Sequence, residues 1–190
     1  MRNDPARSAS AMDAALAIIA EEHRAFDASL AAIVDRIQLV RTHRAEADPA
    51  SFHRATSYIA TFMDHFHHPK EDEFLFKAVR GRTRQLEDVI DHLQHDHRQA
   101  PGIFAELLRS LEGAGAGTEA AFADFAQLFE RYARSQVDHM RMENDEVVPV
   151  ARNVLRLSDW IEIESAFTAN RDPLFSALGG SGALPGPGGR

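Results

Sequence analysis

Two segments of the sequence repeat one pattern of metal-binding residue types. Each has an acidic residue followed by a histidine, and a later His-x-x-x-Glu, with nearly equal steps between them in the two copies. Imidazole nitrogens and carboxylate oxygens are ligands for zinc, iron and manganese, so the repeat predicts a metal site. The residues of this pattern are Glu22-His23, His67 and Glu71 in the first copy, and Asp96-His97, His139 and Glu143 in the second.

The spacing within each copy suits coordination from one face of a helix. Residues i and i+4 lie about one turn apart on a helix. The pair His67 and Glu71, and likewise the pair His139 and Glu143, can therefore each bind one centre from one face of its helix. Burying an unpaired carboxylate is costly, and a divalent cation compensates that cost. A glutamate can chelate one ion or bridge two. Six candidate ligands are more than one ion needs and slightly fewer than two ions need.

His68 is the ambiguous histidine, because it stands beside His67 and before Pro69 and can turn toward a second metal. A lone inward histidine is more often a hydrogen-bonded core residue, and His-x-x-x-Glu is usually a surface pair. The joint pattern on four successive helices favours metal binding over both readings. The remaining histidines are expected at the surface, and they are His43, His53, His65, His92 and His95.

Composition excludes several other kinds of site. The chain has 190 residues and no cysteine, so iron–sulfur clusters, thiolate zinc sites and disulfides are excluded. A net charge of −8 with scattered Lys and Arg argues against nucleic-acid binding. The longest apolar run, Ala14 to Ala20, is too short to span a membrane, and the N-terminus lacks the apolar core of a secretory signal. We therefore expect a cytoplasmic protein.

The elements that must position these residues are helices. Apolar residues recur at steps of three and four and no alternating β-branched run occurs, which predicts an all-α fold. Asp13, Asp48-Pro49 and Thr118 are expected to start the first, second and fourth helices, and Pro69 to kink the second. The inner face of the second helix is expected to run through Ile59, Met63, Phe66, His67, Glu71 and Phe74.

The organisation along the chain follows from these helices. We expect a flexible N-terminus over 1–12, a bundle over 13–153, a helical extension over 154–178 and a disordered Gly/Pro-rich tail over 179–190. The extension should contain a helix capped by Ser158, with Trp160, Ile161 and Phe167 available to pack on the bundle.

These motifs resemble the hemerythrin-like proteins that carry an HHE cation-binding domain. The resemblance covers about residues 13–150 and rests on the two acidic-His pairs, the segment HHPKEDEFLF that starts at His67, and HMRME that starts at His139. It implies an up-down antiparallel four-helix bundle around a non-haem di-iron centre, with dioxygen as the usual small ligand. The implied ligands are His23, His67, Glu71, His97, His139 and Glu143.

Two departures from oxygen-carrying hemerythrins bear on function. Those proteins have His-x-x-x-His on the third helix, where this chain has Leu93 at the first place. On the fourth helix they use His-x-x-x-x-Asp, where this chain has Glu143 at four residues and Asn144 at five. One iron therefore lacks a histidine unless His68 replaces it. A less saturated centre favours oxygen or nitric oxide sensing, redox work or iron handling over oxygen transport.

Two other classes of function stay open from the sequence. The same ligands can support a di-iron redox enzyme acting on peroxide or oxygen, with Tyr132 or Tyr58 as an electron relay. Alternatively, zinc, or no metal at all, would leave a structural bundle that binds partners. Two iron ions are the expected cofactor, with zinc or manganese as alternatives.

Overall fold

The structure, a computed structural model, describes residues 5–114 and 119–169, and over these residues it contains helices and no strands. The predicted all-α fold is confirmed. The helices are α1 (Pro5–Arg41), α2 (Pro49–Phe62), α3 (His68–Lys70), α4 (Lys77–Arg80), α5 (Glu87–Ala114), α6 (Glu119–Met142), α7 (Val148–Val154) and α8 (Leu157–Ala169), with π-helical segments η1 (Met63–His67), η2 (Glu71–Phe76) and η3 (Glu143–Val147).

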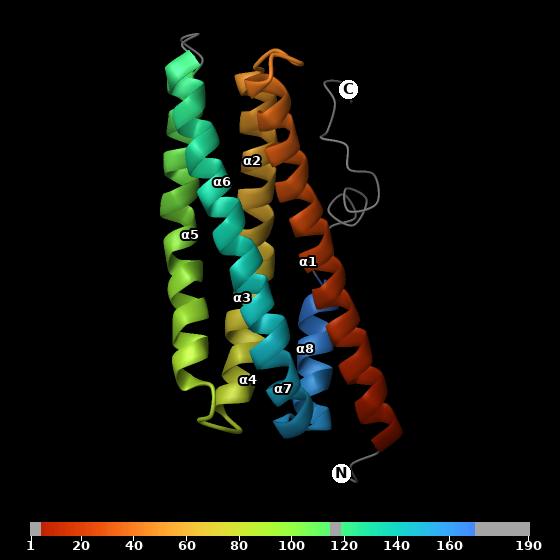
Figure 1. Cartoon of the computed structure of the whole chain (residues 1–190). Helices are drawn as coiled ribbons and strands as arrows, with labels where there is room; N and C mark the ends of the chain where they lie inside the picture. Colours follow the sequence, from red (N-terminus) through yellow and green to blue (C-terminus); the bar gives the residue numbers. More distant parts are fainter. Residues whose placement is uncertain (1–4, 115–118, 170–190) are drawn as a thin grey trace.

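Four long antiparallel rods form the bundle (Figure 1). They are α1, the continuous run from α2 to α4, then α5, and the continuous run from α6 to α7. Consecutive rods run in opposite directions, as in an up-down bundle. The shorter α8 lies along the N-terminal half of α1 and also contacts η2 and α3. In the described part of the chain, α8 therefore lies beside the four rods at one end of the bundle, and the four rods alone form the other end.

The helix starts agree with the sequence in one case and differ in two. The Asp48 side chain accepts a hydrogen bond from the Ser51 N–H at 3.1 Å, and Pro49 opens α2, as predicted. The predicted cap at Asp13 is wrong, because α1 already begins at Pro5 and so includes most of the segment assigned to a flexible N-terminus. Ser158 lies inside α8, and Thr118 is outside the described residues.

Pro69 is accommodated by π-helical turns. The His68 N–H bonds to the Met63 carbonyl five residues back, and the same i−5 bond joins Val148 N–H to Glu143 ahead of Pro149. A π-turn contains one more residue than an α-turn, so residues after it are rotated. Within the wider turn of η1, Met63, His67 and the next residue, His68, are buried, whereas Phe66, predicted to face inward, is 36% exposed.

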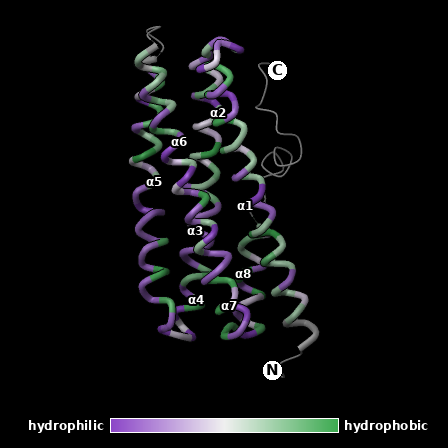
Figure 2. Tube along the Cα trace, in the orientation of Figure 1, coloured by the Kyte–Doolittle hydropathy of each residue, from purple (hydrophilic) through white to green (hydrophobic). Residues whose placement is uncertain are grey.

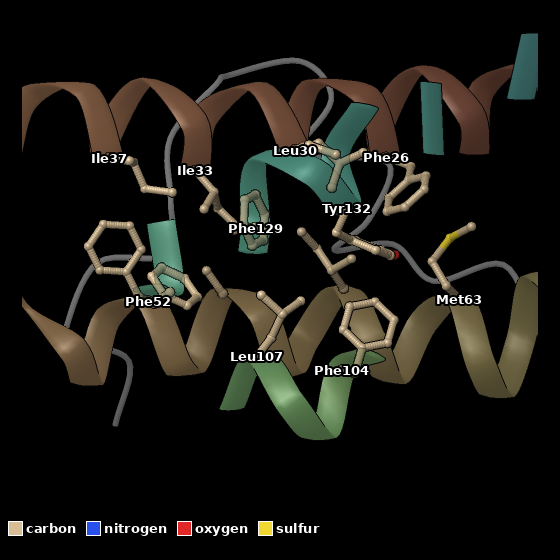
Figure 3. Packing of buried hydrophobic residues seen from close by; sticks show 14 of the residues in the cluster. Phe26, Leu30, Ile33, Ile37, Phe52, Met63, Phe104, Leu107, Phe129 and Tyr132 are labelled. Carbon is tan, nitrogen blue, oxygen red and sulfur yellow. The ribbon is translucent and has the colours of Figure 1, made fainter. Parts of the chain in front are cut away.

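The core consists of two apolar clusters at opposite ends of the bundle. The upper cluster joins α1, α2, α5 and α6, and Figure 3 shows Phe26, Phe52, Phe104 and Phe129 pointing into it from these four helices. The lower cluster includes residues from the N-terminal part of α1, from α4, α7 and α8. Along each of the four rods, the predicted metal-binding residues lie near the point where the upper cluster gives way to the lower one. Hydropathy alternates along each helix, as amphipathic packing requires (Figure 2).

The C-terminal helix packs against the bundle through one face. Trp160, Ile163 and Phe167 are buried, whereas Ile161, which the sequence analysis placed in the contact, is exposed. Arg82 holds the start of α8 through two hydrogen bonds to Asp159, of 2.9 and 2.7 Å. The predicted tail over 179–190 lies outside the described residues. Over the described residues, none of the helices combines the length and apolar character needed to cross a membrane.

Candidate metal centre

The structure gathers every predicted site residue in one buried layer between the two apolar clusters. All seven side chains are buried, while the histidines that were expected at the surface are exposed. The nitrogen and oxygen atoms of the seven buried side chains form three groups that could hold a metal ion, and two of these groups share His97 and His139. The buried residues are His23, His67, His68, Glu71, His97, His139 and Glu143.

The first subsite is formed by His23 of α1 and His67 of η1. Their Nε2 atoms lie 3.0 Å apart. Glu71 Oε1 is 2.9 Å from His67 Nε2 and 3.3 Å from His23 Nε2. These three side chains form one of the potential metal-binding groups, so the first copy of the repeat does converge on one point.

The second subsite is formed by His97 of α5 and His139 of α6, whose Nε2 atoms are also 3.0 Å apart. His68 belongs with them: its ring stacks on the His97 ring with centroids 4.0 Å apart, and it shares a potential metal-binding group with both. His68 reaches this subsite from the neighbouring rod because the π-turn η1 turns it inward beside His67. The fifth buried histidine thus lies at the second subsite.

Each of the two glutamates faces both subsites. Glu71 points Oε1 toward the first histidine pair and Oε2 toward His97, at 3.6 Å. Glu143 points Oε2 toward His23 and Oε1 toward His139, at 3.2 Å in each case. A carboxylate with one oxygen on each side is the arrangement that bridges two ions.

Carboxylates outside the layer orient three of the histidines. The Nδ1 atom of His67 lies 2.7 Å from Glu22, that of His97 lies 3.0 Å from Asp72, and that of His139 lies 3.1 Å from Asp96. An ionised carboxylate only accepts, so each Nδ1 carries the hydrogen and donates it. Each Nε2 is then directed toward the subsite, which is how metal-binding histidines are usually held.

The role of these supporting carboxylates was not predicted from the sequence, although the repeat contained a signal for it. An acidic residue precedes the single histidine in both copies, as Glu22 and Asp96. In the structure each one accepts from the paired histidine of the next rod rather than from its own neighbour. The acidic-His dipeptide therefore supplies one candidate ligand and orients another.

The electrostatics of the layer follow from burial and from the glutamates. Burial by itself lowers the pKa of His23, but Glu143 and Glu71 outweigh it and raise the pKa to about 10. Burial likewise opposes the rise at His139, where Asp96 and Glu143 raise the pKa to about 10. Burial and the neighbouring His97 hold the pKa of His68 well below its usual value, so His68 is neutral, the form that binds metals.

Several buried polar atoms in this layer lack a hydrogen-bond partner of good geometry. They include Oε2 of Glu71, both carboxylate oxygens of Glu143 and both ring nitrogens of His68. Buried polar atoms without partners are costly and uncommon in folded proteins. Divalent cations accept lone pairs from these same atom types, so the donor set fits a metal pair held by nitrogen and oxygen.

Comparison with known families gives the same assignment, since residues 14–151 match the hemerythrin HHE cation binding domain. The chain belongs to this family. All seven buried candidate ligands fall inside the matched range, whereas α8 lies beyond it. No curated protein and no solved structure shows significant similarity to this HHE protein.

Proposed function

We propose that this HHE protein binds two iron ions and responds through them to dioxygen or nitric oxide, in sensing, redox or iron handling. The observation that carries the proposal is the pair of glutamates, each with one oxygen toward each histidine pair. A mononuclear site would need only one of the two histidine pairs. The proposed ligands are His23 and His67 on one side, His68, His97 and His139 on the other, and Glu71 and Glu143 between them.

The chemistry of the donors favours iron. Two histidines with a carboxylate and open positions are the donor set of non-haem iron(II) sites that meet oxygen. Bound iron would supply redox chemistry and positions for small exogenous ligands. The chain's own residues orient the imidazoles of His67, His97 and His139. They also keep Glu71 charged, because His67 outweighs the effect of burial and the pKa of Glu71 stays well below its usual value.

The place of Leu93 supports a role for His68. Leu93 is fully buried in the lower apolar cluster and offers no ligand. His68 lies beside His97 and His139 from a different rod, and both of its ring nitrogens lack a hydrogen-bond partner. We therefore infer that His68 supplies the nitrogen that an oxygen carrier takes from its third helix.

The second subsite is also the more open one. The side chains of Asp72 and Asp96, which orient its histidines, are 34% and 33% exposed. Reversible oxygen transport requires a site that excludes water, because water promotes side reactions of the bound species. This openness favours ligand exchange and redox reaction, and thus a sensing or iron-handling role, over oxygen transport.

Metal titration under argon tests the proposal. Metal-free protein should take up two iron(II) ions per chain, and admission of oxygen should change its visible spectrum. Repeated cycles of oxygen addition and removal should not restore the starting spectrum. Full recovery over many cycles would instead establish an oxygen carrier, and tight uptake of one zinc without iron would support a structural bundle.

A peroxide or oxygen-dependent enzyme is the second outcome to test for. Steady consumption of peroxide by the iron-loaded protein, at many turnovers per site, would favour it over a sensor. A groove of about 780 Å³ between α1 and α6 is lined by residues such as Asp27, Val34 and Glu130, and by none of the seven proposed ligands. It therefore gives no support for an organic substrate at the metals.

A further inference from the structure

Lys70, one residue before Glu71, is buried in the bundle. It is 4% exposed, which is rare for lysine and normally requires a charge partner. Its ammonium group donates to Glu22 at 2.9 and 3.2 Å. Since Glu22 also accepts from His67 Nδ1 at 2.7 Å, the three side chains form a buried chain that runs from α3 through α1 to the first subsite.

The C-terminal helix covers this chain. The Lys70 ammonium lies 4.5 Å from the centre of the Phe167 ring, within the range of a cation–π contact. The same ring meets His67 edge-on, with centroids 6.1 Å apart. Phe167 is fully buried near the end of α8, so this helix contacts both ends of the chain from Lys70 to His67.

Nothing equivalent supports the second subsite within the described residues. Asp72 and Asp96 are each about one-third exposed, and their ion pairs are with histidines. Asp96 has a second contact only with the exposed His92, at 3.7 Å. The two halves of the repeat therefore differ: the first is closed by a lysine and a fifth helix, and the second has carboxylates in contact with solvent.

We propose that Lys70 is a positioning residue for the first subsite and that α8, through Phe167, holds it in place and slows the loss of the metal ion there. This inference rests on the proposed binding of two metal ions. Without the ammonium group, Glu22 would be a buried carboxylate lacking its cation, an arrangement that is strongly unfavourable and drives reorientation or protonation. His67 would then lose the anionic acceptor that directs its Nε2 toward the ion.

The experiment titrates metal-free, full-length protein with cobalt(II) and follows absorption against a competing chelator. Lys70→Met replaces the ammonium with an apolar chain of similar size. We expect affinity at one of two cobalt sites to fall about 10–100-fold, as for other lost partners of ligating histidines, while the other site is unchanged. Lys77→Met is the matched control, because Lys77 lies on the same rod with its side chain 74% exposed.

Proton NMR of the cobalt-loaded protein separates positioning from general stability. Each ligating histidine with an Nδ1–H gives an exchangeable, paramagnetically shifted signal. In Lys70→Met one such signal, that of His67, should move or broaden while the others remain. Phe167→Leu keeps an apolar cover without a ring, and it should release one cobalt ion to chelator about threefold to tenfold faster than wild type.

Each outcome has a definite meaning. If wild type binds two cobalt ions and Lys70→Met matches it in both affinities and in the His67 signal, the inference about Lys70 is overturned and the proposed function is not. Equal weakening of both sites, together with loss of helical signal in circular dichroism, also overturns it in favour of a folding role. Wild type that binds fewer than two ions contradicts the proposed function itself.

Discussion

At the scale of single residues, the two glutamates connect the two histidine pairs. Glu71→Gln keeps the shape of the side chain but removes its charge and one oxygen. Because Glu71 faces both subsites, we expect the affinity for both ions to fall. The loss should exceed the 10–100-fold that is typical when a residue that only orients a metal ligand is removed. Metal content after gel filtration, measured by mass spectrometry, checks this. Glu146→Gln, at an exposed position of η3, is the control and should keep the full metal content.

The supporting aspartates should act on one ion only. Asp72→Asn and Asp96→Asn each weaken the acceptor of a histidine at the second subsite. We expect about a 10–100-fold loss of affinity for one of the two ions, and no change for the other. A chelator competition with two resolved steps measures this. If either variant weakened both steps equally, the division into two subsites would be wrong.

At the scale of helices, the attachment of α8 should depend on pH through Asp159. Burial alone would raise its pKa, but Arg82 and the Arg156 N–H hold the pKa below its usual value. A depressed carboxyl pKa stabilises the folded protein above the unfolded value of about 3.9, and this stabilisation is lost as pH falls through the folded value. Asp159→Asn should therefore lower the melting temperature at pH 7, and the gap to wild type should close below about pH 4.

Asp145→Asn is the control for this comparison. Its carboxylate lies 4.0 Å from Arg141 at the exposed surface, and it should change the melting temperature little at either pH. A gap for Asp159→Asn that stayed constant from pH 7 to pH 3 would show that the carboxylate charge does not hold α8.

The sequence predicted the helices, and the burial of the candidate ligands, better than it predicted what surrounds those ligands. Steps of three and four place the two His-x-x-x-Glu motifs on inner faces, because that spacing depends only on local helix geometry. The prediction for Phe66 was wrong and the role of His68 was left open, since η1, which contains Phe66 and ends just before His68, depends on backbone hydrogen bonds that residue spacing does not reveal. Lys70 and Phe167 were missed because their contacts join distant segments of chain.

At the scale of the whole molecule, a polar layer divides the core, so metal should affect global stability. Any ion that binds only the folded chain stabilises it, by about 2.7 kcal/mol at a hundredfold excess over the dissociation constant. Removing metal with a chelator should therefore lower the melting temperature, and iron(II) or zinc should restore it. Scanning calorimetry checks this, and calcium, which prefers oxygen ligands, is the control ion.

The upper apolar cluster should be separable from metal binding. Phe129 is fully buried there, and Phe129→Ala removes most of a ring from a packed core. We expect a loss of about 3–5 kcal/mol in the free energy of unfolding, measured in urea, with metal stoichiometry unchanged. A variant that lost its metals at temperatures where it remains folded would show that the cluster shapes the site directly.

The π-helical turns fix the register of two of the four rods that carry the candidate ligands, the run from α2 to α4 and the run from α6 to α7. Each i−5 bond, at Met63 to His68 and at Glu143 to Val148, marks one residue more than an uninterrupted α-helix would contain. Residues beyond it are rotated by about 100° relative to a regular helix. A deletion of one residue, harmless in a surface loop, would here shift Val147 and Ala151 off the core face. Evolution can therefore change ligand types at this centre more easily than it can change the length of these two rods.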